Sequence, residues 1–114
     1  MSSLVLFSDQ HHYFLYAGRV SMHKSFDGLS GIVQNELTRE VNTKDVFIFL
    51  NKDLTHIKVL LYEANAFTLL YQRLHKGRFT LPAATASNGS IQLTATDLLS
   101  MLHGLNLHQH KKIA

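Results

Sequence analysis

Residues 46–82 read VFIFLNKDLTHIKVLLYEANAFTLLYQRLHKGRFTLP, and this stretch decides the fold. Three apolar runs rich in β-branched and aromatic residues, at positions 46–50, 57–62 and 67–74, are separated by short connections at 51–55 and 63–66. Such runs are typical of β-strands, and connections this short join neighbouring antiparallel strands. The stretch therefore predicts a tight antiparallel meander.

The second connection sets the register of the predicted hairpin. A loop of two or four residues places Tyr62 opposite Phe67 and Lys58 opposite Tyr71. Because side chains alternate along a strand, one face then carries cationic and aromatic side chains, among them His56, Lys58 and Arg73. The other face carries aliphatic side chains, namely Ile57, Val59, Leu61 and Leu70. A loop of odd length would reverse this assignment.

Upstream of the meander, an apolar run at residues 13–17 predicts a first strand, and Gly18 follows it. From residue 21 to about 38 the apolar period becomes helical. The stripe consists of Met22, Phe26, Leu29, Val33 and Leu37. Ser21 is the expected N-cap. Gly28 and Gly31 disfavour a helix, so a start after Gly28 is an open alternative.

Downstream of the meander, residues 77–81 predict a short strand that Pro82 stops. The small and polar residues 83–90 predict a flexible loop, and residues 91–93 an edge strand. Residues 94–103 predict a second helix, because Thr94 and Asp97 have the spacing of a capping box. Gly104 lies where a helix C-terminal cap is expected.

Together these elements predict one α+β domain over residues 1–114. We expect a small antiparallel sheet with one long helix after the first strand and a short C-terminal helix. Parallel pairing of the first strand, which would make the sheet mixed, is left open. Residues 1–12 and 106–114 are expected to be flexible ends.

Composition limits the classes of protein that the chain can belong to. It has 114 residues, 46% of them hydrophobic, which is enough for one core. The formal net charge of +3 is compatible with an anionic partner. The absence of cysteine excludes disulfides and thiolate metal sites, and is compatible with a reducing cytoplasm. No stretch of 18 apolar residues predicts a membrane span, and we do not interpret the first residues as a signal peptide.

Acidic and histidine residues do not form a catalytic pattern. Metal-dependent nucleases need carboxylates that converge on a metal, and no spacing of Asp27, Asp45, Asp53 and Glu63 brings these together. The histidine pairs at 11–12 and at 108 and 110 lie near the chain ends, without a third ligand in a rigid element. The sequence therefore predicts no enzyme, no metal and no cofactor, and a metal-dependent nuclease is the least favoured alternative.

A basic and aromatic surface is the first candidate site. Lysine, arginine and histidine side chains that could contact phosphates fall near one side of the sheet. They are Arg19, His23, Lys24, Lys52, His56, Lys58, Arg73, Lys76 and Arg78. Aromatic side chains could stack on bases or anchor a protein partner. They are Phe47, Phe49, Tyr62, Tyr71 and Phe79. For the aromatics, core packing or a subunit interface is favoured over base stacking.

A protein interface is the second candidate. Both faces of the predicted sheet are partly apolar, and only two helices are available to cover them. If both helices packed on one face, the other would be exposed, and exposed apolar patches usually mark interfaces. Leu69, Tyr71 and Phe79 would then anchor a partner or a second copy.

The segments YFLYAGRVSMHKSFDGLSGIV at residues 13–33 and the meander at 46–82 resemble one bacterial family. It is the TnpB accessory-protein family, encoded by the second open reading frame of the IS sixty-six insertion sequences. The order of KSFDGL, HIKVLL and RLHKGRFTLP carries the resemblance. Ser21 stands where the family commonly has aspartate, and His23 where it commonly has arginine, which weakens any chemical role for a charged pair there.

The resemblance implies a non-enzymatic accessory factor of DNA transposition in the bacterial cytoplasm. Its implied partners are a separate transposase and other proteins of the same element. DNA at the element ends and a second copy of the chain are further candidate partners. The alternative is a purely protein-binding or homo-oligomeric module that does not bind DNA.

Overall fold

The computed structural model describes residues 10–37, 44–63, 66–81 and 89–102. Within these residues the elements follow each other as β1 (His12–Arg19), α1 (Phe26–Asn35), β2 (Asp45–Leu50), β3 (His56–Glu63), β4 (Ala66–Arg73), β5 (Ser90–Leu93) and α2 (Ala95–Leu102). The strands form one sheet in the spatial order β4-β3-β2-β1-β5. β1 and β2 are parallel, and the other neighbours are antiparallel.

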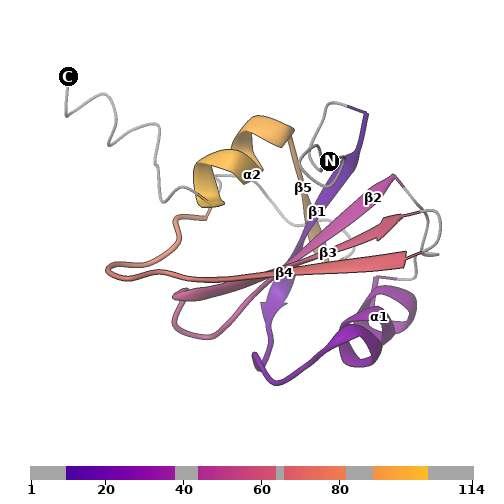
Figure 1. Ribbon diagram of the computed structural model, residues 1–114, viewed down its shortest axis with the longest axis horizontal. Helices are drawn as coiled ribbons and strands as arrows, with labels where there is room; N and C mark the ends of the chain where they lie inside the picture. The colour runs from indigo at the N-terminus through magenta and orange to yellow at the C-terminus, as the bar shows by residue number, and fades with distance from the viewer. Residues whose placement is uncertain (1–9, 38–43, 64–65, 82–88, 103–114) are drawn as a thin grey trace.

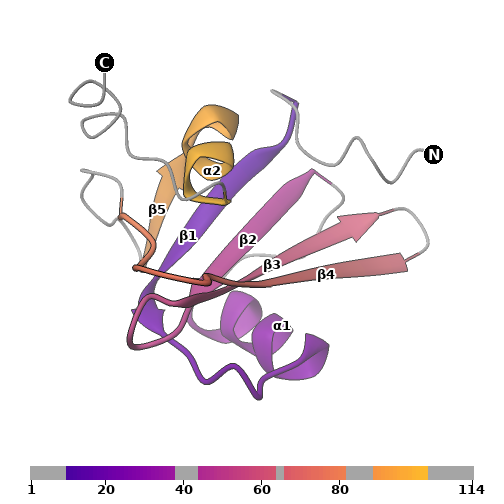
Figure 2. The ribbon, with the colours of Figure 1, turned by 60° about the vertical axis from the view of Figure 1, so that its left-hand side comes forward.

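The central strands are covered on both faces. β2 is buried at every residue, as its unbroken apolar run VFIFL predicts for a strand between two layers. α1 lies on one face of the sheet and α2 on the other (Figures 1 and 2). The molecule thus has three layers, with one helix on each side of the sheet.

Each face of the sheet has its own hydrophobic core. On the α1 face, Leu29 and Val33 of the helix pack with Phe47, Phe49 and other strand residues. On the α2 face, the core contains aliphatic side chains of the strands, the rings of Tyr13 and Phe79, and two residues of the helix, Leu98 and Met101. The strand side chains alternate between these two cores, which fixes the pairing register.

The predicted fold class needs correction. The structure is mostly β, a mixed five-stranded sheet with two short helices in the described residues, rather than an antiparallel sheet with a long helix after the first strand. The parallel pairing of β1 with β2, left open above, makes the sheet mixed. The connection between two parallel strands must cross over a face of the sheet, and α1 lies in that crossover.

The predicted start of the first helix is wrong. Ser21 is not the N-cap, because the helix begins only after Ser25, and the hydrogen bond of 3.1 Å from the His23 amide to the Ser21 hydroxyl lies in a turn before the helix. The helix begins after Ser25 and continues through both glycines to Asn35. The alternative start after Gly28 is therefore also wrong. Extended and turn residues precede the helix because the Lys58 ammonium binds their carbonyls, as described below.

Several local predictions are confirmed. The β3–β4 register pairs His56 with Arg73 and Tyr62 with Phe67, as expected. The capping box of α2 is present, since the amide of Asp97 donates to the Thr94 hydroxyl at 3.1 Å and the amide of Thr94 donates to the Asp97 carboxylate at 3.2 Å.

The strand predicted at 77–81 is not formed. Gly104, most of the loop at 83–90 and most of both chain ends lie outside the described residues.

Candidate nucleic-acid interface

Three segments meet at one end of the sheet. They are the last residues of β1, the β2–β3 connection, and residues 73–81, which start at the last residue of β4 (Figure 2). They carry five exposed lysine and arginine side chains. We call this set the basic end, and it comprises Arg19, Lys52, Arg73, Lys76 and Arg78. One acidic residue, Asp53, lies beside Lys52 in the same connection.

Backbone hydrogen bonds hold these three segments together. The amide of Val20 donates to the Leu50 carbonyl at 2.9 Å, which ties the end of β1 to the end of β2. The amide of Phe79 donates to the Leu54 carbonyl at 2.6 Å, and the Phe79 ring is only 2% exposed. Phe79 therefore anchors the segment that carries Lys76 and Arg78 against the β2–β3 connection.

Asn51 organises the connection that carries Lys52. Its side-chain oxygen accepts the amides of Thr55 and His56, both at 2.9 Å, which closes the turn. Leu54 has a φ of 60° in this turn, a left-handed conformation that costs energy in a residue other than glycine. Sequence reasoning did not single out Asn51, although asparagine is a typical turn-closing residue.

The five charges of the basic end have no salt-bridge partner among the described residues. In the described part of the chain no salt bridge includes them, and the pair that is present, His12 with Asp45 at 4.0 Å, lies at the other end of the sheet. The rest of the described chain holds more acidic than basic residues. Among the described residues the basic end is thus the most positive part, and it can attract a polyanion.

Lys58 has a different environment. It is only 8% exposed, and its ammonium donates hydrogen bonds of 2.7 Å to the carbonyls of Met22 and Lys24. The same nitrogen lies 5.1 Å from the centre of the Tyr71 ring, within reach of a cation–π interaction. Lys58 therefore fastens the segment before α1 to the sheet, and its charge is already bound.

The remaining basic candidates, His56, His23 and Lys24, lie near Lys58. His56 is half-buried; its Nδ1 atom lies 2.7 Å from the Thr55 hydroxyl, and its ring stacks on Tyr71 with centroids 5.9 Å apart. His23 and Lys24 are exposed, in the segment that runs from the end of β1 to α1. The structure therefore does not gather all nine predicted residues at one place.

Most of the aromatic candidates belong to the core. Phe47 and Phe49 are fully buried, Phe79 is 2% exposed and Tyr62 is 5% exposed, so these rings have no free face for a base. Tyr71 is 56% exposed. Phe67, absent from the predicted aromatic set, is 55% exposed and makes an edge contact with Tyr62 at 4.7 Å. Its position opposite Tyr62 was predictable, but its exposure depends on β4 being an edge strand.

The described residues contain no group of three or more histidine or acidic side chains that could hold a metal ion. Asp45 and Asp53 lie at opposite ends of β2, as their separation in the chain indicates. Neither helix in the described part of the chain is long and apolar enough to span a bilayer.

The structure thus presents a small strand-rich protein with a cluster of exposed cations that form no salt bridge within the described residues. A family model described as IS66 Orf2 like protein matches residues 11–112, and the chain belongs to this family. The resemblance seen in the sequence is confirmed. No curated protein and no solved structure matches the chain significantly. The family is an accessory protein of IS66 elements and not a known enzyme, so membership implies an accessory role in transposition.

Proposed function

We propose that this accessory protein binds the phosphate backbone of the insertion-sequence ends through its basic end, and so helps a separate transposase to assemble there. The observation that carries the proposal is the grouping of five exposed lysine and arginine side chains on three segments that hydrogen bonds hold together. Because the reaction acts on bacterial DNA, the proposal places the protein in the cytoplasm.

The arrangement supports backbone contact more strongly than base recognition. Lysine and arginine neutralise phosphates of any sequence, whereas unspecific stacking on bases needs exposed aromatic rings. Four of the five predicted aromatic side chains are buried, and the ring of the fifth, Tyr71, already packs on His56. In this proposal the transposase therefore supplies most of the sequence specificity.

Fluorescence anisotropy across a salt series tests the proposal, with a duplex of the terminal inverted repeat and a scrambled duplex. If all five cations contact phosphates, the logarithm of the affinity falls against the logarithm of salt concentration with a slope of about −4.5. Similar affinities for the two duplexes are expected. Absence of binding at low salt refutes DNA contact and favours a purely protein-binding accessory role.

A matched pair of double variants locates the contact. Lys52→Gln/Lys76→Gln removes two charges from the basic end, and should reduce the slope by about 1.8. Lys24→Gln/Lys44→Gln removes the same charge from exposed positions elsewhere, and should leave the slope nearly unchanged. An equal reduction of the salt slope in both variants would show that net charge, rather than the basic end, attracts DNA.

A further inference from the structure

β4 is an edge of the sheet with no described element along its outer side (Figures 1 and 2). Its first seven residues, 66–72, carry no charge and no proline. Proteins usually protect a long edge strand with charges, proline or a bulge, because a bare edge pairs with another chain. The other edge strand, β5, has only four residues and leads directly into α2.

We propose that the β4 strands of two copies of this protein pair antiparallel around a twofold axis at Leu69, and so form one continuous sheet. A second copy is the occupant that suits this edge, because an uncharged strand can face itself without opposing like charges. This inference does not rest on DNA binding.

The backbone of β4 favours this register. The amide of Leu74 donates to the Thr55 carbonyl at 2.9 Å, and the β3–β4 pairing continues from that point along both strands. In an antiparallel ladder alternate residues bond to a given neighbour, so Gln72, Leu70 and Thr68 point their backbone groups toward β3. The amides and carbonyls of Leu69 and its odd-numbered neighbours then point outward. A twofold axis at Leu69 lets these groups bond to the same groups of the second copy.

The side chains favour the same register. With Leu69 facing Leu69, each Phe67 lies opposite Tyr71 of the second copy. These two rings are 55% and 56% exposed in the single chain, and both lie on the α1 side of the sheet with Leu69. The register thus buries two pairs of exposed aromatic rings, which are favourable partners across strands.

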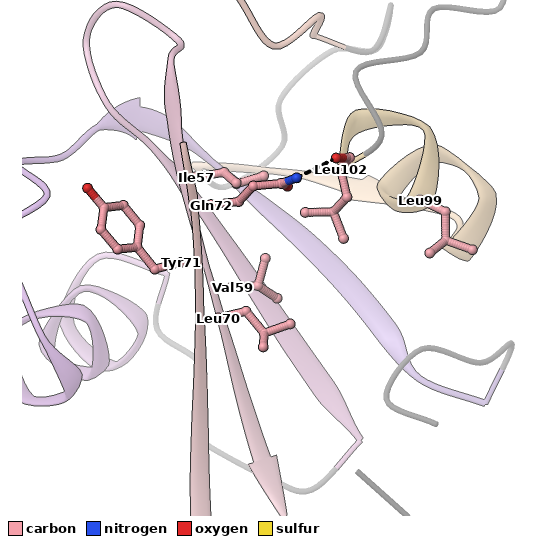
Figure 3. Close-up of a pocket in the computed structure, with 7 residues that line it drawn as sticks. All are labelled: Ile57, Val59, Leu70, Tyr71, Gln72, Leu99 and Leu102. Atoms are coloured by element: carbon pink, nitrogen blue, oxygen red, sulfur yellow. Dashed lines mark hydrogen bonds between the residues drawn. The ribbon is translucent and has the colours of Figure 1, made fainter. Parts of the chain in front are cut away.

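The α2 side of the edge is also apolar. A groove of about 370 Å³ lies between α2 and strands β3 and β4 (Figure 3). Leu70 and Leu99 line it, and the Gln72 side chain closes one part of it by donating to the Leu102 carbonyl at 2.8 Å. Tyr71 points to the other side of the sheet (Figure 3). In the proposed dimer both helices α2 lie on the same face, so the two grooves extend toward each other.

Introduced cysteines test the register directly, because the natural chain contains none. Phe67→Cys/Tyr71→Cys should form a covalent dimer under mild oxidation, since the two thiols face each other across the axis. Each single variant should stay uncrosslinked, because identical positions lie about 14 Å apart along the strands, beyond disulfide reach. Crosslinking of Tyr71→Cys alone to the same extent, or none in the double variant, overturns the proposed pairing.

Charged variants test the same pairing without oxidation, by sedimentation velocity over a range of concentrations. Phe67→Lys/Tyr71→Lys places lysine opposite lysine twice, and should weaken dimerisation at least about tenfold. Phe67→Lys/Tyr71→Glu changes the same two exposed positions but places opposite charges together, and should restore the dimer. A monomeric natural protein at all concentrations, or equal behaviour of the two variants, overturns the inference.

Discussion

Replacement of Lys58 by methionine should destabilise the fold, because this lysine is a structural residue. Its ammonium donates two hydrogen bonds of 2.7 Å to the carbonyls of Met22 and Lys24. It is only 8% exposed, and it lies 5.1 Å from the centre of the Tyr71 ring. Methionine keeps an unbranched apolar side chain of similar length, but it has no donor. The variant therefore removes these interactions with little change in packing.

The size of the effect follows from these contacts. A hydrogen bond to a charged group contributes about 1.5–3 kcal/mol, and the cation–π contact about 0.5–1 kcal/mol. Two terms offset part of this loss. The variant no longer removes an ammonium from water, and water can reach the two released carbonyls in a partly exposed segment. We expect a net loss of about 2–3 kcal/mol in the free energy of unfolding, which lowers Tm by roughly 10 °C in a domain of this size.

Urea unfolding followed by circular dichroism measures this loss. Lys76→Met is the matched control, because Lys76 is exposed and should change stability by less than about 0.5 kcal/mol. Under conditions in which Lys58→Met is folded, this variant should keep the salt slope of DNA binding. Arg73→Gln should instead reduce that slope by about 0.9 without loss of stability. An unfolding free energy of Lys58→Met within about 0.5 kcal/mol of the natural protein would refute the structural role.

Three further changes test local features. Thr94→Ala removes the N-cap hydroxyl of α2 and should cost about 1 kcal/mol in urea unfolding, whereas Thr96→Ala, exposed in the same helix, should cost little. Gly18→Ala should cost about 1 kcal/mol by the same measurement, because the added methyl carbon would lie 2.8 Å from the half-buried Tyr16 ring and would push it aside. The hydrogen bond from the Tyr16 hydroxyl to the Glu36 carboxylate raises the pKa of Tyr16, with burial and the carboxylate charge adding to the shift. The stabilisation that this hydrogen bond provides is present below about pH 10 and is lost as pH rises through the raised pKa of Tyr16. Tyr16→Phe should therefore be less stable than the natural protein at pH 7. Between pH 9 and 11 it should lose less stability than the natural protein does.

Local patterns in the sequence were sufficient to predict the pairing of β3 with β4 and the capping box of α2. The register of β3 with β4 depends on a short connection and on alternation, which are both visible in the sequence. The reciprocal bonds between Thr94 and Asp97 depend only on residues three apart. In each case the interactions that decide the structure are between residues close in the chain.

The helix start and the role of Lys58 depend on contacts between distant residues. Met22 fits the apolar stripe of a longer helix, but the Lys58 ammonium, 36 positions away, binds its carbonyl and holds the segment out of the helix. The alternation of β3 correctly placed Lys58 on a face with aromatic rings, yet it could not show that α1 and its preceding segment cover that face. The distinction between a buried and an exposed cation therefore required the tertiary structure.

The two proposed surfaces predict a combined property that neither has alone. In an antiparallel pair centred on Leu69, the two Arg73 side chains lie about 27 Å apart along the strands, at opposite ends of the joined sheet. The dimer would then present two basic ends that face away from each other, a geometry that holds two DNA segments rather than one. This conclusion rests on both proposals.

Capture of a fluorescent duplex by an immobilised duplex measures such bridging. The natural protein should bridge the two, and Lys52→Gln/Lys76→Gln should weaken both bridging and binding to a single duplex. Phe67→Lys/Tyr71→Lys should bind a single duplex at least as well as the natural protein, since it adds positive charge. It should lose bridging at a protein concentration at which its weakened dimer dissociates into monomers. Bridging that persists in this monomeric variant would show that one chain contacts two duplexes by itself, and would refute the role assigned to β4.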